Sequence, residues 1–269
     1  MPISVTHSSR DDAYHLSWAN GKIRAALAAR AFGTEYPAEV DASSNCTWSV
    51  LAAMLRALRL RPDDLLVDLG CGRGGPGLWL ARATSARLVG VDHSQQAIEI
   101  ATVRATSFVP NGMARFQIGT FEDTGLPDSC ANGVVSMDAL PWASDRDAAL
   151  RELRRILRPR ARAVFTGSDR LPGHPTFASE TPTWRDRILD AGLEIELDLE
   201  RTEAGPQWQR LYEAWQEHEA EMRADIGDIQ TENMLEEART VGPLLPYMRL
   251  GLFVVRAPYL SQTRSSCKD

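Results

Sequence analysis

The chain of 269 residues lacks several features that would place it in other classes of protein. No apolar run reaches the roughly 18 residues of a membrane-spanning helix, and the first residues lack the apolar core of a secretory signal. The four cysteines are scattered, without the spacing of a zinc site or the density of a disulfide framework. Basic residues number 30 against 36 acidic ones, and this net charge of −6 does not indicate a nucleic-acid partner. We therefore expect a reduced, cytoplasmic protein that binds no membrane, no nucleic acid and no metal.

What the sequence does contain is an alternation of strand-like and helix-like segments. Short apolar runs predict strands at 65–69, 87–91, 114–118, 133–137, 162–166, 194–199 and 250–257. Helical periodicity predicts helices at 11–31, 47–60, 76–83, 94–107, 145–157 and 181–191. Ser94 is expected to cap the fourth of these helices, and Ser144 with Asp147 resembles a capping box for the fifth. Strands that alternate with helices indicate a parallel sheet covered on both faces.

A longer helical pattern covers residues 206–240, with an interruption near Gly227, and lies between the last two predicted strands. We interpret this insert as a lid on the α/β core rather than as a separate domain. The predicted parts of the chain are an N-terminal helical cover at 1–61, a core at 62–200 and 246–260, a helical lid at 201–245 and a flexible tail at 261–269.

The sharpest signal is a glycine-rich stretch, VDLGCGRGGPG, which overlaps the end of the first predicted strand. A helix follows it, and amide groups at a helix start favour a polar or negative ligand group. Gly70, Gly72 and Gly75 satisfy the pattern GxGxxG, and Asp92 ends the next strand, where a carboxylate suits two ribose hydroxyls. Both features also fit a nicotinamide-dependent oxidoreductase, and a tight turn without a ligand is a further alternative. Asp68 opposes the nicotinamide reading, because a carboxylate beside the loop repels a pyrophosphate and holds a cationic amino-acid moiety.

These segments resemble the motifs of class I S-adenosylmethionine-dependent methyltransferases. VDLGCGRGG resembles their first motif, LVGVDHS the second, GTFEDTGLPDSCANGVVSMDAL the third and fourth, and RELRRILRP the segment that follows. The similarity covers about residues 62–168 and is greatest to the bacterial branch that includes many natural-product methyltransferases. It implies a Rossmann-like, doubly wound, seven-stranded sheet of order 3-2-1-4-5-7-6, with strand 7 antiparallel, N-terminal helices and a helical lid.

The resemblance also implies S-adenosylmethionine as the cofactor and S-adenosylhomocysteine as its product. The implied cofactor contacts are Asp68, Gly70, Cys71, Gly72 and Gly74 around the methionine moiety, Asp92 at the ribose, His93, Thr120 and Phe121 beside the adenine, Asp138 facing the methyl donor, and Trp48, Tyr14 and Tyr36 from the covering helices. Thr120 stands where the family often has an aspartate, which puts that adenine contact in doubt. Leu140, Pro141 and Trp142 stand where relatives often carry a histidine, which removes a familiar general base.

The catalytic and substrate residues are less defined. His218, His174 and His15 are candidate general bases, although each also fits an ordinary structural histidine. Aromatic residues predict an apolar substrate pocket, with core packing as the alternative; they are Trp142, Phe177, Trp208, Tyr212 and Trp215. We expect a monomer or homodimer that methylates an oxygen or nitrogen atom of a hydrophobic small molecule in secondary metabolism. The alternative is a cyclase or pericyclase on the same fold that binds S-adenosylmethionine without net methyl transfer.

Overall fold

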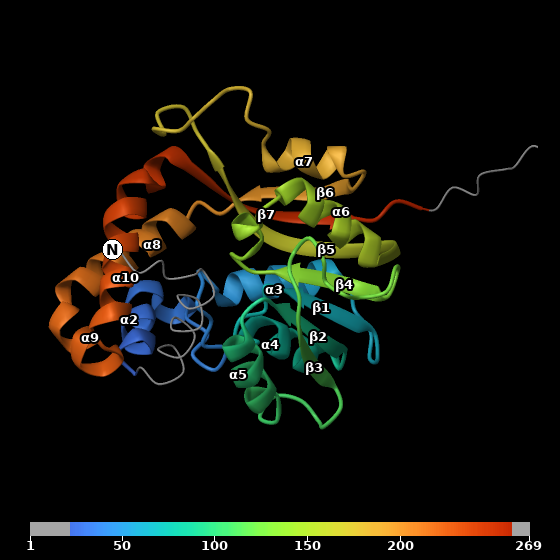
Figure 1. Ribbon diagram of the computed structural model, residues 1–269, viewed down its shortest axis with the longest axis horizontal. Helices are drawn as coiled ribbons and strands as arrows, with labels where there is room; N and C mark the ends of the chain where they lie inside the picture. The colour runs from blue at the N-terminus through green and yellow to red at the C-terminus, as the bar shows by residue number, and fades with distance from the viewer. Residues whose placement is uncertain (1–21, 260–269) are drawn as a thin grey trace, which may run out of the picture.

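The computed structural model describes residues 22–259, which form one twisted sheet with helices on both faces (Figure 1). The strand order is β3-β2-β1-β4-β5-β7-β6, and β7 runs antiparallel to both of its neighbours, as the resemblance implied. The strands are β1 (Leu65–Leu69), β2 (Arg87–Asp92), β3 (Ala114–Ile118), β4 (Ala131–Ser136), β5 (Leu157–Arg170), β6 (Glu194–Glu200) and β7 (Met248–Arg256). The order reverses between β1 and β4, which is where ligands bind in open α/β sheets.

Two helical layers cover the sheet, and each buries its own apolar cluster. On one face lie α3 (Trp48–Leu58), α4 (Gly75–Thr84) and α5 (Gln95–Ala105), which bury Leu51, Met54 and Leu78 against the strands. On the other face lie α6 (Arg146–Ile156) and α7 (Trp184–Asp190), with Leu150, Leu153 and Trp184 packed on Phe165 and Phe253. Both faces of β1 and β4 are therefore buried, as expected of parallel strands.

Local capping explains where several helices begin. Ser94 caps α5 as predicted, since its hydroxyl accepts a hydrogen bond from the Ala97 N–H at 3.1 Å. The prediction for α6 was wrong, because the N-cap is Asp145 rather than Ser144. One Asp145 carboxylate oxygen accepts from the amides of Asp147 and Ala148, at 2.9 and 3.0 Å, so it serves two amides at the helix start that would otherwise lack partners.

The strand predicted at 162–166 is considerably longer in the structure. β5 pairs with β4 on one side, and on the other it pairs with β7 along the whole stretch from Arg162 to Arg170. This length depends on the position of β7, which comes late in the chain. Conversely, the helix predicted at 181–191 begins only at Trp184, because Thr183 and Asp186 form a capping box there.

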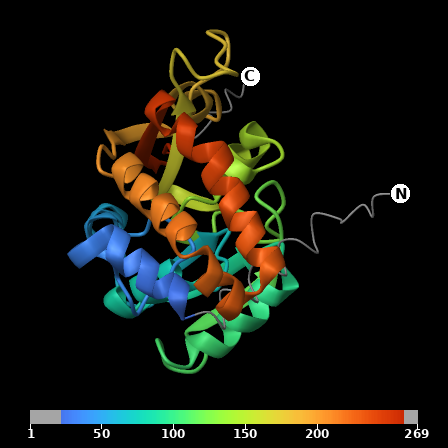
Figure 2. The same ribbon diagram turned by 90° about the vertical axis from the view of Figure 1, so that its left-hand side faces the viewer.

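Four helices and one 3-10 helix form a separate cover at one end of the sheet (Figures 1 and 2). They are α2 (Ile23–Phe32), α8 (Ala204–Glu217), α9 (Glu219–Ile226), α10 (Asp228–Val241) and η3 (Gly242–Tyr247). They enclose a third apolar cluster that includes Leu27, Leu211 and Met234. The helical pattern predicted at 206–240 is broken at His218 and at Gly227, which has a φ of 83°.

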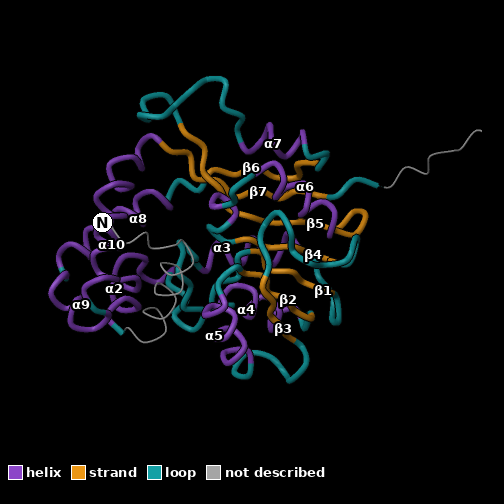
Figure 3. Tube along the Cα trace, viewed as in Figure 1, coloured by secondary structure: helices purple, strands orange, loops and turns teal. Residues whose placement is uncertain are grey.

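Loops lie between the strands and this cover, as Figure 3 shows in teal. A 3-10 turn, η1 (Gly33–Glu35), ends α2, and the following loop leads to α3, where the Thr47 hydroxyl accepts from the Val50 N–H at 3.3 Å. Within residues 22–259, no helix is long and apolar enough to cross a lipid bilayer. The first part of the helix predicted at 11–31 and the tail predicted at 261–269 lie outside the described residues.

Candidate functional site

The glycine-rich loop after β1 is held in a conformation that few other residues could adopt. Gly70, Gly72 and Gly74 have positive φ angles of 68°, 49° and 77°. The Gly70 amide donates to the carbonyl oxygen at the end of β2, on Val91, at 2.8 Å. A Cβ on Gly70 would lie 2.5 Å from the Cβ of Ala139, so even alanine would force the loop away from the end of β4. The loop is therefore fixed between the ends of β2 and β4.

Asp92, the last residue of β2, supports this loop directly. Its Oδ2 accepts from the Gly72 N–H at 2.7 Å, and its Oδ1 accepts from the Ser94 N–H at 3.0 Å. A carboxylate offers about four acceptor positions, so lone pairs remain for ligand hydroxyls. His93 follows with its ring about half exposed and its Nδ1 3.6 Å from Asp92 Oδ1. The structure thus brings Asp92, His93 and the loop glycines together.

Asp68 lies beneath the loop rather than open to solvent. Its side chain is buried, and its Oδ2 accepts from the Gly77 N–H in the first turn of α4 at 3.1 Å. Burial raises the pKa of Asp68 to about 7, against the opposing effect of the Gly77 hydrogen bond, and Asp92 raises it further. The carboxylate therefore ties β1 to the first turn of α4.

The predicted adenine side is formed by the loop after β3. Phe121 packs against the glycine loop, because a Cβ on Gly70 would lie 2.8 Å from its ring. Thr120 is exposed, and its amide and hydroxyl both bond to the backbone of Asp123, at 2.9 and 3.0 Å. The Thr120 hydroxyl therefore stabilises a turn. Cys71, within the glycine loop, is buried, and burial raises the pKa of its thiol.

The segment from Val40 to Thr47, which we call the strap, is clamped to the glycine loop at its first residues. Arg73, within that loop, donates to the carbonyl and carboxylate oxygens of Asp41 at 2.6 and 2.8 Å. Arg104 donates to the Val40 carbonyl at 2.8 Å. A Cβ on Gly75 would lie 2.3 Å from that same carbonyl oxygen, so the strap approaches the start of α4 as closely as glycine allows.

A second clamp holds the other end of the strap at Asp138, just beyond β4. Asp138 has a φ of 50°, and its Oδ2 accepts from the Asn45 N–H at 2.8 Å. Its Oδ1 accepts from the Thr166 hydroxyl of β5 at 2.6 Å. Arg201, which follows β6, lies 3.4 Å from Oδ1 and donates to both the backbone and side-chain oxygens of Asn45 at 2.5 Å. Sequence reasoning missed Asn45, Thr166 and Arg201, because no local motif marks them.

Three predicted substrate residues lie along one helix of the cover. Trp208 stacks on Tyr212 with ring centroids 5.4 Å apart, and Tyr212 packs against Trp215 at 5.3 Å. Tyr212 and Trp215 are buried in the apolar cluster of the cover. The Tyr212 hydroxyl donates to Glu237 of α10 at 2.9 Å. Core packing, the alternative in the sequence interpretation, therefore accounts for Tyr212 and Trp215.

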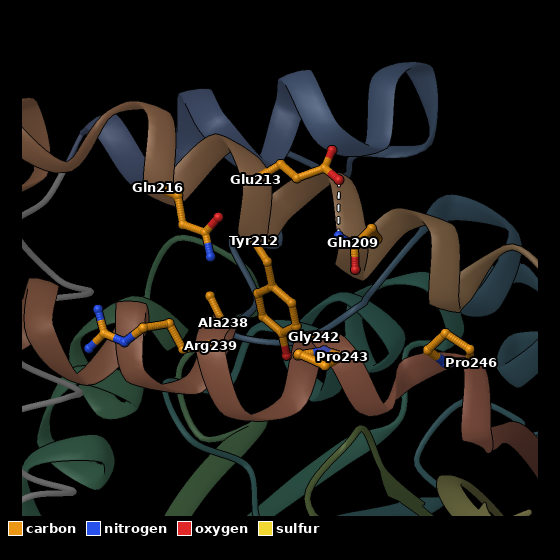
Figure 4. Close-up of a pocket in the computed structure, with 9 residues that line it drawn as sticks. All are labelled: Gln209, Tyr212, Glu213, Gln216, Ala238, Arg239, Gly242, Pro243 and Pro246. Carbon is orange, nitrogen blue, oxygen red and sulfur yellow. Dashed lines mark hydrogen bonds between the residues drawn. The ribbon is translucent and has the colours of Figure 1, made fainter. Parts of the chain in front are cut away.

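Tyr212 also forms the floor of a groove between α8 and α10 (Figure 4). The groove has a volume of about 410 Å³ and is lined by Gln209, Tyr212, Glu213, Gln216, Ala238, Arg239, Gly242, Pro243 and Pro246. Its rim is polar and exposed, and a hydrogen bond of 2.9 Å joins Gln209 to Glu213 across one turn of α8. The groove therefore belongs to the surface of the cover.

The other two predicted substrate residues are exposed. Trp142 lies in η2 (Leu140–Trp142), directly after the end of β4, and is 81% exposed. Phe177 lies in the loop between β5 and α7 and is 40% exposed. Single exposed apolar side chains are common on protein surfaces, so a role for these two residues rests on their place in the fold. Both positions follow the carboxyl ends of central strands.

The aromatic residues expected to cover the cofactor lie in different environments. Trp48 of α3 packs edge-to-face against Trp79 of α4, with ring centroids 5.6 Å apart. It therefore connects two helices that cover the same face of the sheet. Tyr36 lies near the strap, and its buried hydroxyl has no hydrogen-bond partner in the described part of the chain. Burial, together with the charge of Asp41, raises the pKa of Tyr36 to about 12. Tyr14 lies outside the described residues.

Two of the histidines proposed as bases already have polar partners, and His218 also lies 3.5 Å from Arg30 of α2 through its Nε2. His218 lies at the junction of α8 and α9, with its Nδ1 2.9 Å from the Ala214 carbonyl oxygen. The Nδ1 of His174 accepts from the Thr176 N–H at 3.2 Å. His15 lies outside the described residues. No group of three or more His, Cys, Asp or Glu side chains in residues 22–259 is arranged to hold a metal ion.

Comparison with known proteins shows what this fold is similar to. Residues 67–165 match a family model described as a methyltransferase domain. That segment runs from β1 through the glycine loop to β5, and the sheet order is that of the Rossmann-like methyltransferases. Residues 67–165 are therefore similar to a methyltransferase domain, and the chain has the fold of the class I S-adenosylmethionine-dependent methyltransferases.

Individual relatives extend this comparison. An uncharacterised 37.1 kDa protein of transposon Tn4556 from Streptomyces fradiae is 34% identical over 169 residues, which cover 60% of this chain and 46% of that protein. The 27-O-demethylrifamycin SV methyltransferase of Amycolatopsis mediterranei is 30% identical over 108 residues, or 40% of each chain. This chain thus matches less than half the length of either relative. The crystal structure of the [4+2]-cyclase SpnF shares the fold, with a TM-score of 0.67, 19% identity and coverage of 78% of this chain and 80% of that one.

Proposed function

We propose that the protein transfers a methyl group from S-adenosylmethionine, which binds over the glycine loop and under the strap. The observation that carries this proposal is the meeting of Gly70–Gly74 with the Asp92 carboxylate, at the ends of adjacent parallel strands. Asp138 lies two residues after the end of β4, on the opposite side of the point where the strand order reverses. A ligand in this crevice would contact all three elements.

The residues present fit this cofactor. The positive-φ glycines let the methionine moiety approach the backbone, and the remaining lone pairs of Asp92 suit the ribose hydroxyls. His93 and Phe121 border the adenine position. The side-chain nitrogen of Asn45 is buried without a hydrogen-bond partner in residues 22–259, and so offers a donor to the cofactor carboxylate.

The protein's own contribution to the reaction is positioning. S-adenosylmethionine supplies a methyl group that is already activated by a sulfonium. Holding donor and acceptor in line can lower the barrier by about 7–11 kcal/mol in favourable cases. A general base would add about 10²- to 10⁴-fold, and only where the acceptor must lose a proton. We assign no base, since the ring of His174 bonds to Thr176, and the ring of His218 contacts the Ala214 carbonyl and Arg30 of α2.

We propose that the acceptor is an oxygen or nitrogen atom of a hydrophobic small molecule in secondary metabolism. The rifamycin methyltransferase, by its name, methylates an oxygen of a natural product. Trp142 and Phe177 expose aromatic surface after β4 and β5, and Trp208 is only partly buried on the cover. The helices between β6 and β7 would act as the lid over this acceptor, in a monomer or a homodimer.

Calorimetric titration with S-adenosylmethionine and S-adenosylhomocysteine tests the cofactor assignment. We expect both to bind the wild type, and Asp92→Asn to weaken binding because it removes the charged acceptor at the end of β2. Asp190→Asn, at an exposed position on α7, is the matched control and should bind like the wild type. Absence of binding to the wild type would refute the proposal. Labelled methyl incorporation then screens hydrophobic acceptors.

A cyclase or pericyclase that retains the cofactor is a second candidate. The cyclase SpnF shares the fold. The family resemblance also implies that many members carry a histidine where this chain has the Leu140–Trp142 turn. A cyclase of this kind would bind S-adenosylmethionine tightly and would not consume it. Quantifying S-adenosylhomocysteine after turnover of a converted substrate separates the two, because methyl transfer forms one equivalent and cyclisation forms none.

A further inference from the structure

Arg201 lies at the junction between the core and the helical cover. It follows the last residue of β6 and precedes α8, and its backbone N–H donates to the Leu250 carbonyl of β7 at 2.7 Å. Its side chain is only 9% exposed and points back to the core, where it meets Asp138. An arginine is seldom buried unless it is paired, so these contacts account for its position.

The side chain of Arg201 closes a ring of three residues from distant parts of the chain. Its guanidinium donates twice to Asn45, and lies 3.4 Å from Asp138 Oδ1. The Asn45 N–H donates to the other Asp138 oxygen at 2.8 Å. Asn45 is fully buried, so loss of Arg201 would leave two of its oxygens without donors. The planar, forked guanidinium can serve these acceptors together, whereas an ammonium is a single point charge.

The ring adjoins the proposed cofactor site on two sides. Ala139, next to Asp138, is the residue that a Cβ on Gly70 would strike at 2.5 Å. Cys46, next to Asn45, is buried where the charges of Asp138, Arg201 and Asp68 all act on its thiol. A shift of Asn45 or Asp138 would therefore move residues that border the proposed cofactor site.

We propose that Arg201 is a positioning residue that fixes the strap over the cofactor site and ties it to the first helix of the cover. The inference rests on the proposed function for its role in catalysis, but the ring itself can be tested without any ligand. In this arrangement the strap is held at Asp41 by Arg73 from the glycine loop, and at Asn45 by Arg201 from the cover junction. The position of the strap over the cofactor site and the start of the cover are therefore linked through one side chain.

The test compares Arg201→Met with Arg162→Met. Arg162 is similarly buried, at 17% exposure, and is paired with Glu196 on β6, away from the strap. In the ligand-free proteins, we expect amide hydrogen exchange at Asn45 to accelerate at least tenfold in Arg201→Met and to stay unchanged in Arg162→Met. Calorimetry should show S-adenosylhomocysteine affinity about tenfold weaker in Arg201→Met alone, a change of about 1.4 kcal/mol.

Arg201→Lys keeps the positive charge but replaces the planar guanidinium with an ammonium. We expect its Asn45 exchange rate and its S-adenosylhomocysteine affinity to lie between those of the wild type and Arg201→Met. If Arg201→Met does not fold, the comparison of Arg201→Lys with the wild type provides the test. Equal Asn45 exchange in the wild type and in the Arg201 variants would overturn the proposal. A wild type that binds no cofactor would instead refute the proposed function, and the exchange result would still report on the ring. Asp138→Asn combined with Arg201→Met should be less damaging than the sum of the two changes, because both act on one network.

Discussion

Asp68 should make the stability of the protein fall as the pH rises through neutrality. Burial is the main cause of the rise in its pKa from 3.8 to about 7 in the folded protein. In the unfolded chain the carboxyl loses its proton near its ordinary pKa, whereas in the folded protein it holds the proton until about pH 7. The folded state therefore binds more protons between these values, and the free energy of unfolding falls as pH rises.

The size of the change in the free energy of unfolding follows from the same two pKa values of Asp68. A displacement from 3.8 to about 7 corresponds to about 4 kcal/mol over the whole window, since one pH unit is worth about 1.4 kcal/mol. Roughly 2–3 kcal/mol of this falls between pH 5 and 8. Asp68→Asn removes the titration, while its side-chain oxygen can still accept from the Gly77 N–H. We therefore expect the variant to gain stability relative to the wild type as pH rises.

The assay is urea denaturation of wild type and Asp68→Asn at half-unit steps from pH 5 to 8.5. The difference between the two proteins isolates Asp68 from every other titrating group. Asp190→Asn, on the exposed side of α7, should show a flat difference from the wild type over the same range. A flat difference for Asp68→Asn as well would show that the buried carboxyl titrates normally. The account of the bond between β1 and α4 would then be wrong.

Further substitutions test the strap and the aromatic residues. Gly75→Ala should cost about 1–3 kcal/mol in chemical denaturation, because its Cβ would meet the Val40 carbonyl at 2.3 Å; Gly205→Ala, with open space around it, should be neutral or slightly stabilising. Trp142→Ala should leave the unfolding free energy within about 0.5 kcal/mol of the wild type but raise the KM for an aromatic or lipophilic acceptor in a methyl-transfer assay. Trp215→Ala should cost about 3–5 kcal/mol in thermal or urea unfolding, because its ring is buried in the cover, and a cost below 1 kcal/mol would contradict that packing.

Much of the core could be predicted because its signals are local. β1 and β3 begin and end where the apolar runs begin and end, since turn residues and glycines bound them. The break at Gly227 follows from a residue with φ of 83° that closes one helix and opens the next. The motif of the glycine loop is equally local, and its assignment as a cofactor site stays a prediction for the binding experiment.

The features that sequence reasoning missed depend on contacts between distant segments. β5 extends to Arg170 because β7 pairs with it, and no pattern within β5 indicates that partner. Arg201, Asn45 and Asp138 form one ring, yet nothing near any of them in the sequence marks the other two. A buried network of this kind is specified by burial and geometry, which a single sequence does not display.

The aromatic residues of α8 illustrate a related limit. α8 lies between α2 and α10, so it needs apolar side chains on two flanks rather than one. A helix packed in this way has a wide apolar stripe, and its spacing is the same whether a residue faces a neighbouring helix or a bound substrate. Tyr212 and Trp215 pack within the cover, which gives this unit a core of its own. Apolar packing is non-directional, so the orientation of the cover on the sheet depends more on directional hydrogen bonds and ion pairs. The buried Arg201 ring at the strap is one such link.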